Sequence, residues 1–327
     1  MKTNTVQSIE KARWLALYRG MALARLIEER LIRLYHQGQI FGGVYTGRGQ
    51  EAIGAATALA GGPEDLYAPC IRNMTVHIGR GESALNIFRQ YLGRATGPTR
   101  GRDGNVHYGN LKNGVYTMIS HLGAMLSVVT GGVMAKRYRG IEAVGVAYIG
   151  DGATSTGDFH EAVNFASVFN TPIIFLIENN KYAYSTPNTV QYRCKQLVDR
   201  APGYGIEGVR ADGNDAVSLY LLVRQLMADI RVKPRAILLE CDTMRMRGHG
   251  EHDDFSYVPR ELLEQYEKRD PLTVARGRLT AEGALTAAEL DAVERECQEE
   301  VDRSYHQALN EPEPDPSTVT EGVYADD

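Results

Sequence analysis

Apolar and polar residues alternate along the chain with two different periods, and these periods predict the secondary structure. In residues 8–37, apolar side chains between Leu26 and Tyr35 recur at helical spacing with charged ones between them, and Gly38 follows as a stop signal. The same spacing predicts further helices over residues 51–59, 84–92, 122–136, 159–169 and 216–230, and two charged helices within 270–309 that separate near Gly283.

Short apolar runs between these helices predict strands. Residues 143–149 and 172–177 are almost wholly apolar, which is typical of strands buried on both faces of a parallel sheet. Further strands are expected at 66–71, 208–211 and 236–241. Because strands and helices alternate, the simplest architecture is an α/β fold with a doubly wound parallel sheet, flanking helices and a C-terminal helical extension.

One structural unit with three segments is expected. These are an N-terminal helical segment (1–60), an α/β domain (61–269), and C-terminal helices with a proline- and acid-rich tail (270–327). The glycine-rich stretch 93–114 has little apolar periodicity and predicts a long loop, and loops of that length in a compact domain usually serve function.

Composition narrows the class of partner. The chain of 327 residues has a formal net charge of -5 and no long block of either sign, which argues against nucleic acid and anionic membranes. Its four cysteines are widely separated, as expected of reduced thiols. A charged N-terminus and the lack of a long apolar run predict no signal peptide, no membrane span and a cytoplasmic location.

Polar clusters follow the two apolar runs, at the edge of a parallel sheet where ligands bind. The first is Gly150-Asp151-Gly152 and the second is Asn179-Asn180. In a dinucleotide site the run GDGATSTG would lack the third glycine of G-x-G-x-x-G. A carboxylate beside bound phosphates would repel them by several kcal/mol unless a cation intervened. Asp151 and Asn180 are therefore candidate magnesium ligands.

Each cluster also has an ordinary structural explanation, since Asp151 can cap a helix and paired asparagines can form a turn. Together, however, Gly-Asp-Gly followed after 26 residues by Asn-Asn resembles the signature of thiamine-diphosphate enzymes. The segments RLYHQGQIFGG, GRGQEAIGAA, DGNVHYG, GDGATSTGDFHEAVNFA, PIIFLIENNKYAYSTP and YGIEGVRADGND resemble α subunits of the decarboxylating component of 2-oxo acid and acetoin dehydrogenase complexes.

This resemblance implies thiamine diphosphate and Mg²⁺ as cofactors and gives roles to individual residues. Side chains of Asp151 and Asn180 and the main-chain carbonyl of Tyr182 would hold the metal. The other residues implied to bind the cofactor are Arg72 at the diphosphate, Ser120 and Leu122 around the aminopyrimidine, Gly150, Gly152 and Ala153 in the turn, and His249, which is also the implied catalytic residue.

Three residues have no assigned role. His107 lies in a loop that resembles an active-site loop of the family, and a loop histidine without function is the alternative. Ile71 stands where many relatives have tyrosine, and His121 where others have proline or valine, which puts the substrate pocket in doubt.

The implied function is that of an α subunit that decarboxylates a 2-oxo acid, of the pyruvate or branched-chain type, and passes the acyl group to a lipoyl acyltransferase. Acetoin cleavage by the same cofactor is the alternative. The resemblance also implies a heterotetramer of two α and two β chains, with the β chain supplying a glutamate. A catalytically silent cofactor-binding subunit and a nicotinamide-binding Rossmann enzyme are rival hypotheses.

Overall fold

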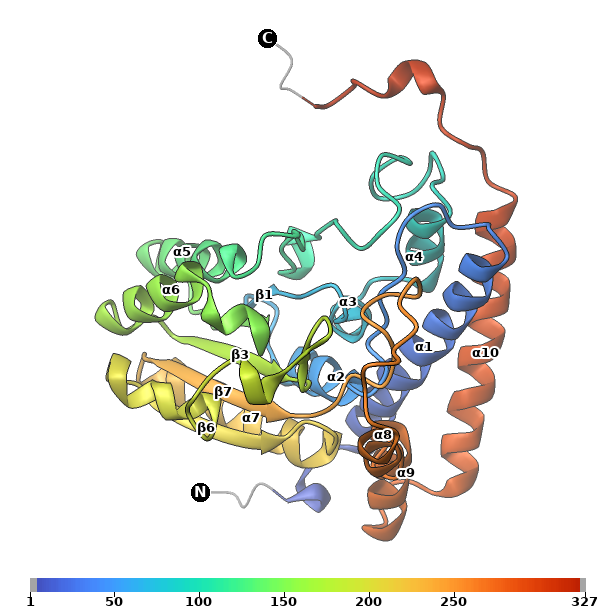
Figure 1. The fold of residues 1–327 in the computed structure, drawn as a ribbon. Coiled ribbons are helices and arrows are strands. Elements are labelled where there is room, and N and C mark those ends of the chain that lie inside the picture. Colours follow the sequence, from blue (N-terminus) through green and yellow to red (C-terminus); the bar gives the residue numbers. More distant parts are fainter. Residues whose placement is uncertain (1–4, 324–327) are drawn as a thin grey trace.

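A five-stranded parallel sheet forms the centre of the computed structural model, which describes residues 5–323 (Figure 1). Its strands, in spatial order, are β1 (Leu66–Ala68), β2 (Gly145–Gly150), β3 (Ile173–Asn179), β7 (Ala236–Asp242) and β6 (Glu207–Asp212). All four neighbouring pairs run parallel. The carboxyl ends of all five strands therefore meet at one edge of the sheet, as the predicted α/β class requires.

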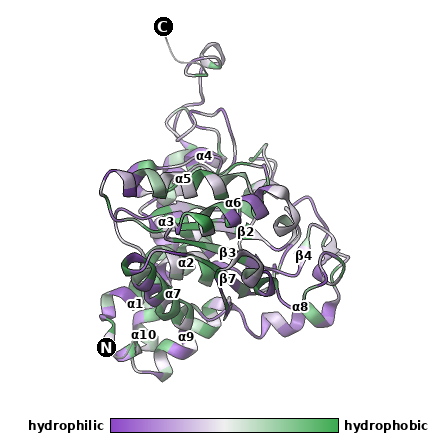
Figure 2. Ribbon diagram, turned by 90° about the vertical axis from the view of Figure 1, so that its left-hand side faces the viewer, coloured by the Kyte–Doolittle hydropathy of each residue, from purple (hydrophilic) through white to green (hydrophobic). Residues whose placement is uncertain are grey.

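Alternate residues of the central strands belong to two different hydrophobic cores. Ile174 and Leu176 of β3 pack in the larger core, whereas Phe175 and Ile177 pack in the smaller one. This follows from the period of two along a strand, and it requires apolar residues at every position. The strands are accordingly green in the hydropathy view (Figure 2).

Helices cover both faces of the sheet. The smaller core is closed by α5 (Ala124–Tyr138) and α6 (Gly157–Val168). The larger core is closed by α1 (Lys11–His36), α2 (Glu51–Ala60), α4 (Ala84–Tyr91), α7 (Ala216–Val232), α9 (Pro271–Ala281) and α10 (Ala287–Leu309). Within residues 5–323, each helix is too short or too polar to cross a lipid bilayer.

The first and last long helices lie side by side, although they are far apart in sequence (Figure 1). Helix α10 begins at a capping box in which the Thr286 hydroxyl accepts from the Glu289 amide and the Glu289 carboxylate accepts in return. It packs against α1 and α4, so the C-terminal helices belong to the larger core. The three-segment division stays a prediction, and its residues 1–4 and 324–327 lie outside the described part of the chain.

Several predicted elements need correction at their ends. The strand expected over 66–71 ends at Ala68, because the Cys70 amide donates to the Asn73 side chain at 2.7 Å and the chain turns there. The first helix begins at Lys11, after a short 3-10 turn. The loop over 93–114 is confirmed, with a single 3-10 turn at Leu111–Asn113.

Other elements gave no clear sequence signal. These are α3 (Met74–Gly79), α8 (Arg260–Glu267), the hairpin of β4 (Tyr182–Ala183) and β5 (Thr186–Pro187), and 3-10 turns at Gly152–Ser155, Asn188–Val190, Leu197–Tyr204 and Pro316–Thr318. All are short, so an apolar period of 2 or 3.6 residues has too few repeats to stand out.

We expect Leu176→Ala to lower the free energy of unfolding by about 2–5 kcal/mol, because it leaves a cavity in the centre of the sheet. Leu176 is fully buried in β3. Val232→Ala, at a side chain that is 87% exposed, is the control and should change stability by less than about 0.5 kcal/mol. Urea denaturation of both variants measures the difference, and equal midpoints would contradict the assigned core.

Candidate functional site

The ends of β2 and β3 bring the two sequence motifs together. Gly150 of β2 is in register with Glu178 of β3, so the residues that follow each strand are neighbours. The Asp151 amide donates to the Glu178 carbonyl at 3.3 Å. Asp151 and Asn180 therefore face one another at the carboxyl edge of the sheet. They are 29 positions apart in the sequence.

Three oxygen atoms converge at this edge. The Asn180 side-chain oxygen lies 3.1 Å from the Tyr182 carbonyl oxygen and 3.3 Å from Asp151 Oδ1. Turning the amide would place a nitrogen there that donates to both atoms. The orientation with three facing oxygens is the one that a cation favours, since adjacent ligands of an octahedral Mg²⁺ at about 2.1 Å lie roughly 3 Å apart. The donor set and its spacing thus fit magnesium.

Burial controls the Asp151 carboxyl group, which is 1% exposed. Loss of hydration raises its pKa to about 6, against the opposing effect of hydrogen bonds from the backbone and from Gln191. The Gln191 amide nitrogen lies 3.4 Å from Asp151 Oδ2 and also donates to the Thr186 carbonyl at 2.8 Å. No ion pair of the Asp151 side chain is found among the described residues, although Lys181 acts on its pKa from further away. A buried carboxylate of this kind is one that a bound cation stabilises.

The turn after β2 is shaped by small residues. A Cβ on Gly152 would lie 2.3 Å from the Ala183 side chain, so this position requires glycine for the turn to pack against β4. A Cβ on Gly150 would meet nothing within 4 Å. Gly150 and Ala153 both line a small cavity at this edge. The turn therefore offers backbone to a ligand at close range, with free space beside Gly150.

The Asn180 side chain is bonded to the residue that precedes α2. Its amide nitrogen donates to the Gln50 side-chain oxygen at 2.8 Å. Gln50 in turn lies 3.4 Å from Glu178, which also accepts from Asn73 at 2.7 Å. All four side chains are buried. This polar layer explains why the GRGQEA segment lies next to the strand ends, and it keeps the Asn180 oxygen directed at Asp151.

Two arginines meet one histidine beside this edge. Arg72 Nη2 lies 3.3 Å and Arg245 Nη1 3.2 Å from His249 Nδ1. Arg72 also donates to the His249 carbonyl at 2.5 Å, and Arg245 to the Tyr184 carbonyl at 2.8 Å. Because a guanidinium group only donates, His249 Nδ1 must be the acceptor in both contacts.

Burial and neighbouring positive charges lower the pKa values of His249 and Arg72. Burial first, then Arg72 and Arg245, lower the pKa of His249 to about 4. Burial and then Arg245 lower the pKa of Arg72 to about 10. Two guanidinium groups that destabilise one another form a site with affinity for an anion such as a phosphate. Burial also lowers the pKa of Arg245, while Tyr257, Asp253 and Asp151 oppose this shift.

Arg245 was not predicted from the sequence. It lies two residues before Arg247 in RMRGHG, and nothing in the pattern separates the two arginines. In the fold, Arg245 is 1% exposed and bonded to Tyr257, whereas Arg247 pairs with Glu251 at 3.3 Å. Gln50 and Gln191 were missed for the same reason, since their roles depend on contacts across the fold.

A cavity of about 110 Å³ opens between the ends of β1 and β2. Its walls are mainly apolar and include Cys70, Ile71, Ser120, His121, Leu122, Gly150 and Ala153. Leu122 is 63% exposed although it is a large apolar side chain. The structure thus brings Ser120 and Leu122 to the same cavity as the turn after β2, and it places Ile71 and His121 there as well.

His107 also reaches this region. Its Nδ1 lies 2.9 Å from Asp103 Oδ2, and its Nε2 lies 3.5 Å from the Ser120 hydroxyl. His107 therefore has two side-chain partners beside the cavity, and a functional role for it stays a prediction.

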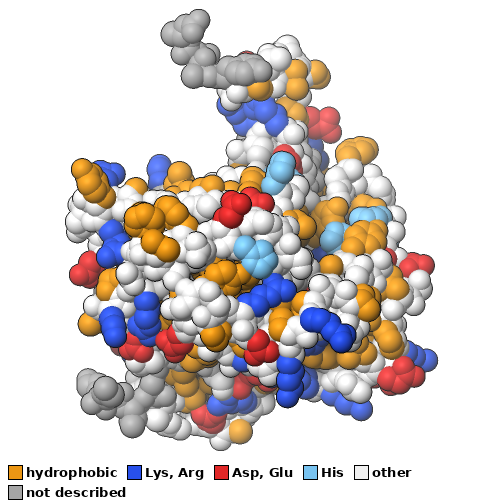
Figure 3. Space-filling model, turned by 60° about the vertical axis from the view of Figure 1, so that its left-hand side comes forward, with side chains coloured by type: hydrophobic (Ala, Val, Ile, Leu, Met, Phe, Trp, Pro, Cys, Tyr) orange, Lys and Arg blue, Asp and Glu red, His pale blue; other side chains and the backbone are white. Residues whose placement is uncertain are grey.

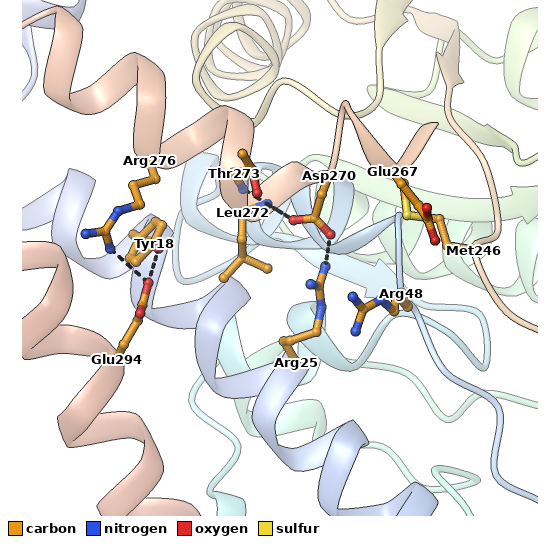
Figure 4. Close-up of a pocket in the computed structure, with 10 residues that line it drawn as sticks. All are labelled: Tyr18, Arg25, Arg48, Met246, Glu267, Asp270, Leu272, Thr273, Arg276 and Glu294. Atoms are coloured by element: carbon orange, nitrogen blue, oxygen red, sulfur yellow. Dashed lines mark hydrogen bonds and ion pairs between the residues drawn. The ribbon is translucent and has the colours of Figure 1, made fainter. Parts of the chain in front are cut away.

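A larger hollow lies elsewhere, among α1, α9 and the segment around Met246, with a volume of about 440 Å³ (Figure 4). Its arginines face carboxylates: Arg25 contacts Asp270 at 2.9 Å and Arg276 contacts Glu294 at 3.1 Å. Because these charges neutralise one another, the hollow has little charge left for a ligand, and we do not assign the chemistry to it. On the face in Figure 3, basic and acidic side chains are likewise interspersed.

Comparisons with known proteins give a family and several relatives for this chain. A family model described as dehydrogenase E1 component matches residues 18–317. The chain is 32% identical over 317 residues to the α subunit of acetoin:2,6-dichlorophenolindophenol oxidoreductase of Cupriavidus necator, covering 97% of this chain and 95% of that protein. It is 35% identical over 318 residues to the 2-oxoisovalerate dehydrogenase subunit alpha of Bacillus subtilis, covering 94% of each.

A third relative is the pyruvate dehydrogenase E1 component subunit alpha of Rickettsia felis, at 30% identity over 314 residues and 96% of both chains. The three relatives are named for different substrates and cover nearly the whole chain. Similarity of this extent defines the family but does not choose among the substrates.

We expect the imidazole of His249 to titrate near pH 4 and to be neutral at pH 7, which NMR of the ring nitrogens can measure. Arg245→Met removes a positive neighbour and should raise this pKa by about one unit. Arg247→Met is the matched control and should leave it unchanged, because Arg247 pairs with Glu251. A midpoint at the ordinary value of a free histidine in the unmodified chain would refute the contact with both arginines.

Proposed function

The chain belongs to the dehydrogenase E1 component family, and we propose that it is the α subunit of a thiamine-diphosphate-dependent dehydrogenase acting on a 2-oxo acid, with acetoin as the alternative substrate. The observation that carries the proposal is the convergence of three oxygens at the ends of β2 and β3, next to two arginines that face one histidine. Such a site suits a magnesium-bound diphosphate.

The residues present fit both cofactors. Asp151, Asn180 and the carbonyl of Tyr182 would hold Mg²⁺, and Gly150, Gly152 and Ala153 would let the diphosphate approach the backbone. Arg72 and His249 would contact the diphosphate, and we add Arg245 because it faces the same imidazole. Ser120 and Leu122 would surround the aminopyrimidine in the cavity that they line.

When bound, thiamine diphosphate supplies the ring that accepts electrons as the carbon–carbon bond next to the substrate carbonyl breaks. The protein residues hold and orient it. A neutral His249 with both arginines on Nδ1 has its other ring nitrogen free for a proton, so it can act as a donor to the diphosphate or to the acyl group on transfer.

Partner chains are part of the proposal. Relatives of this chain are named as α subunits, and in the described residues the lining of the small cavity contains no carboxylate. We therefore propose a heterotetramer with a β chain that supplies the missing glutamate, and a lipoyl acyltransferase that takes the acyl group. A cytoplasmic location also stays part of the proposal.

The rival reading of a silent cofactor-binding subunit predicts cofactor affinity without turnover. The named ligand residues are all present, together with His249 and the buried layer that supports them. This completeness favours an active enzyme. A nicotinamide-binding enzyme would instead bind its cofactor without magnesium, which the experiment below separates.

Asp151→Ala should weaken thiamine diphosphate binding by more than about 100-fold and remove its dependence on magnesium, because the cation loses its only charged ligand from this chain. Isothermal titration of the α chain coexpressed with its β chain, with and without Mg²⁺, measures this. Asp158→Ala, at an exposed position of α6, should bind as the unmodified protein does. Unchanged affinity of Asp151→Ala would refute the metal site.

Turnover with an artificial electron acceptor tests the substrate class. We expect the coexpressed α and β chains to reduce the acceptor with pyruvate, with branched 2-oxo acids or with acetoin, and only when thiamine diphosphate and Mg²⁺ are present. Tight cofactor binding without turnover on any of these substrates would favour the silent subunit instead.

A further inference from the structure

The lining of the small cavity between the ends of β1 and β2 has few polar side chains. Of the described residues that line it, Cys70 and Tyr148 are unsuited to proton exchange, because burial raises the pKa of both groups. The Tyr148 hydroxyl is moreover bonded to Thr57. Ser120 and His121 are the exposed polar groups of the lining. Of these two, Ser120 has a side-chain partner among the described residues.

That partner is His107, which is itself fixed by a carboxylate. Since Asp103 Oδ2 lies 2.9 Å from Nδ1, this nitrogen carries a proton that it donates to the carboxylate. Nε2 is then directed at the Ser120 hydroxyl, 3.5 Å away. Neutral His107 accepts from Ser120, whereas protonated His107 donates to it. The three residues are thus linked in the order Asp103, His107, Ser120, and Ser120 lines the cavity.

The loop that carries this line is anchored to the body of the protein. Buried Gln90 of α4 donates to the carbonyls of Asp103 and Asn105 at 2.9 and 2.7 Å, and its side-chain oxygen accepts from Thr99. The Asn105 amide donates to Asp103 Oδ1 at 2.7 Å, which leaves Oδ2 for the histidine. The carboxylate and imidazole are thus held in place before any ligand binds.

Residues that follow α10 are bonded to the beginning of the same loop and to the helix before it. Arg89 forms a bidentate pair with Glu311, with both contacts at 2.6 Å, and the Ala95 amide donates to the Pro312 carbonyl at 3.0 Å. The beginning of the loop is thus bonded to the chain after α10, and Asp103 is bonded to Gln90 of α4. His107 is held through its own contact with Asp103.

We propose that Asp103, His107 and Ser120 form a proton relay that serves the substrate carbonyl oxygen. The inference rests on the proposed function, since it requires substrate in this cavity. Ser120 touches the substrate, and His107 and Asp103 act through it as positioning and proton-carrying residues.

The relay moves one proton and needs no further reactant. As negative charge develops on the carbonyl oxygen, the Ser120 O–H bond breaks and its proton passes to that oxygen. Protonated His107 donates its Nε2 proton to Ser120 Oγ, so the serine is restored and the imidazole becomes neutral. The Nδ1 proton stays on His107 and continues to donate to Asp103. Solvent then reprotonates His107, whose side chain is 27% exposed.

Chemical rescue tests the relay in the coexpressed α and β complex. His107→Gly should lower kcat about 100-fold with little change in KM, since general acid catalysis contributes about that much. Free imidazole should restore kcat at least about tenfold, because the position is open to solvent. Ser120→Ala should lower kcat similarly without rescue, and Lys112→Ala, at an exposed position of the same loop, should behave as the unmodified complex.

Thiamine diphosphate titration of each variant separates a relay from a structural role. We expect the affinity of His107→Gly to stay within about twofold of the unmodified complex, since His107 contacts neither the arginine cluster nor the metal ligands. Loss of kcat together with cofactor affinity, without rescue by imidazole, would overturn the relay, as would full activity of His107→Gly. If the unmodified complex binds no cofactor, the proposed function fails first and the relay fails with it.

Discussion

A carboxylate buried at the end of a central strand is the constraint on which the site depends. Asp151 has almost no contact with solvent, and burial raises its pKa. Such a group destabilises a folded protein unless a positive charge accompanies it. Oxygens of Asn180 and Tyr182 lie on the same side of the strand ends and cannot neutralise it. The proposed cation, shared by all three oxygens, would account for this arrangement.

The surrounding fold maintains this arrangement through a second layer of buried polar groups. Gln50, Asn73 and Glu178 bond with one another and with Asn180, so that segments from α2, the turn after β1 and the end of β3 are joined at one place. Burial raises the pKa of Glu178 to about 7, with Asn73 and Arg72 opposing the rise. Polar networks of this kind are stable only when their members are paired, which restricts each side chain to one orientation.

Charge is divided between two sides of the site. Oxygens lie at the strand ends, while Arg72 and Arg245 lie beside them around His249. The proposed magnesium diphosphate would complement both sides, since its metal needs oxygen ligands and its phosphate oxygens need donors. The small cavity continues from this point toward Ser120 and the exposed Leu122 side chain, and in the proposed complex this end would face a second chain. The same opening is where the Asp103 and His107 pair reaches the cavity wall.

The sequence by itself determined the α/β class, the long helices and the buried central strands, because each has several repeats of its apolar period. It also selected Asp151 and Asn180 as candidates, since both lie shortly after apolar runs and parallel strands end at one edge. Only the tertiary structure decided which of Arg245 and Arg247 faces His249, how Gln50 reaches Asn180, and that Asp103 and Ser120 lie on either side of His107. These contacts join residues whose separation in sequence follows no period, and they form only when the packing of helices on the sheet brings their loops together.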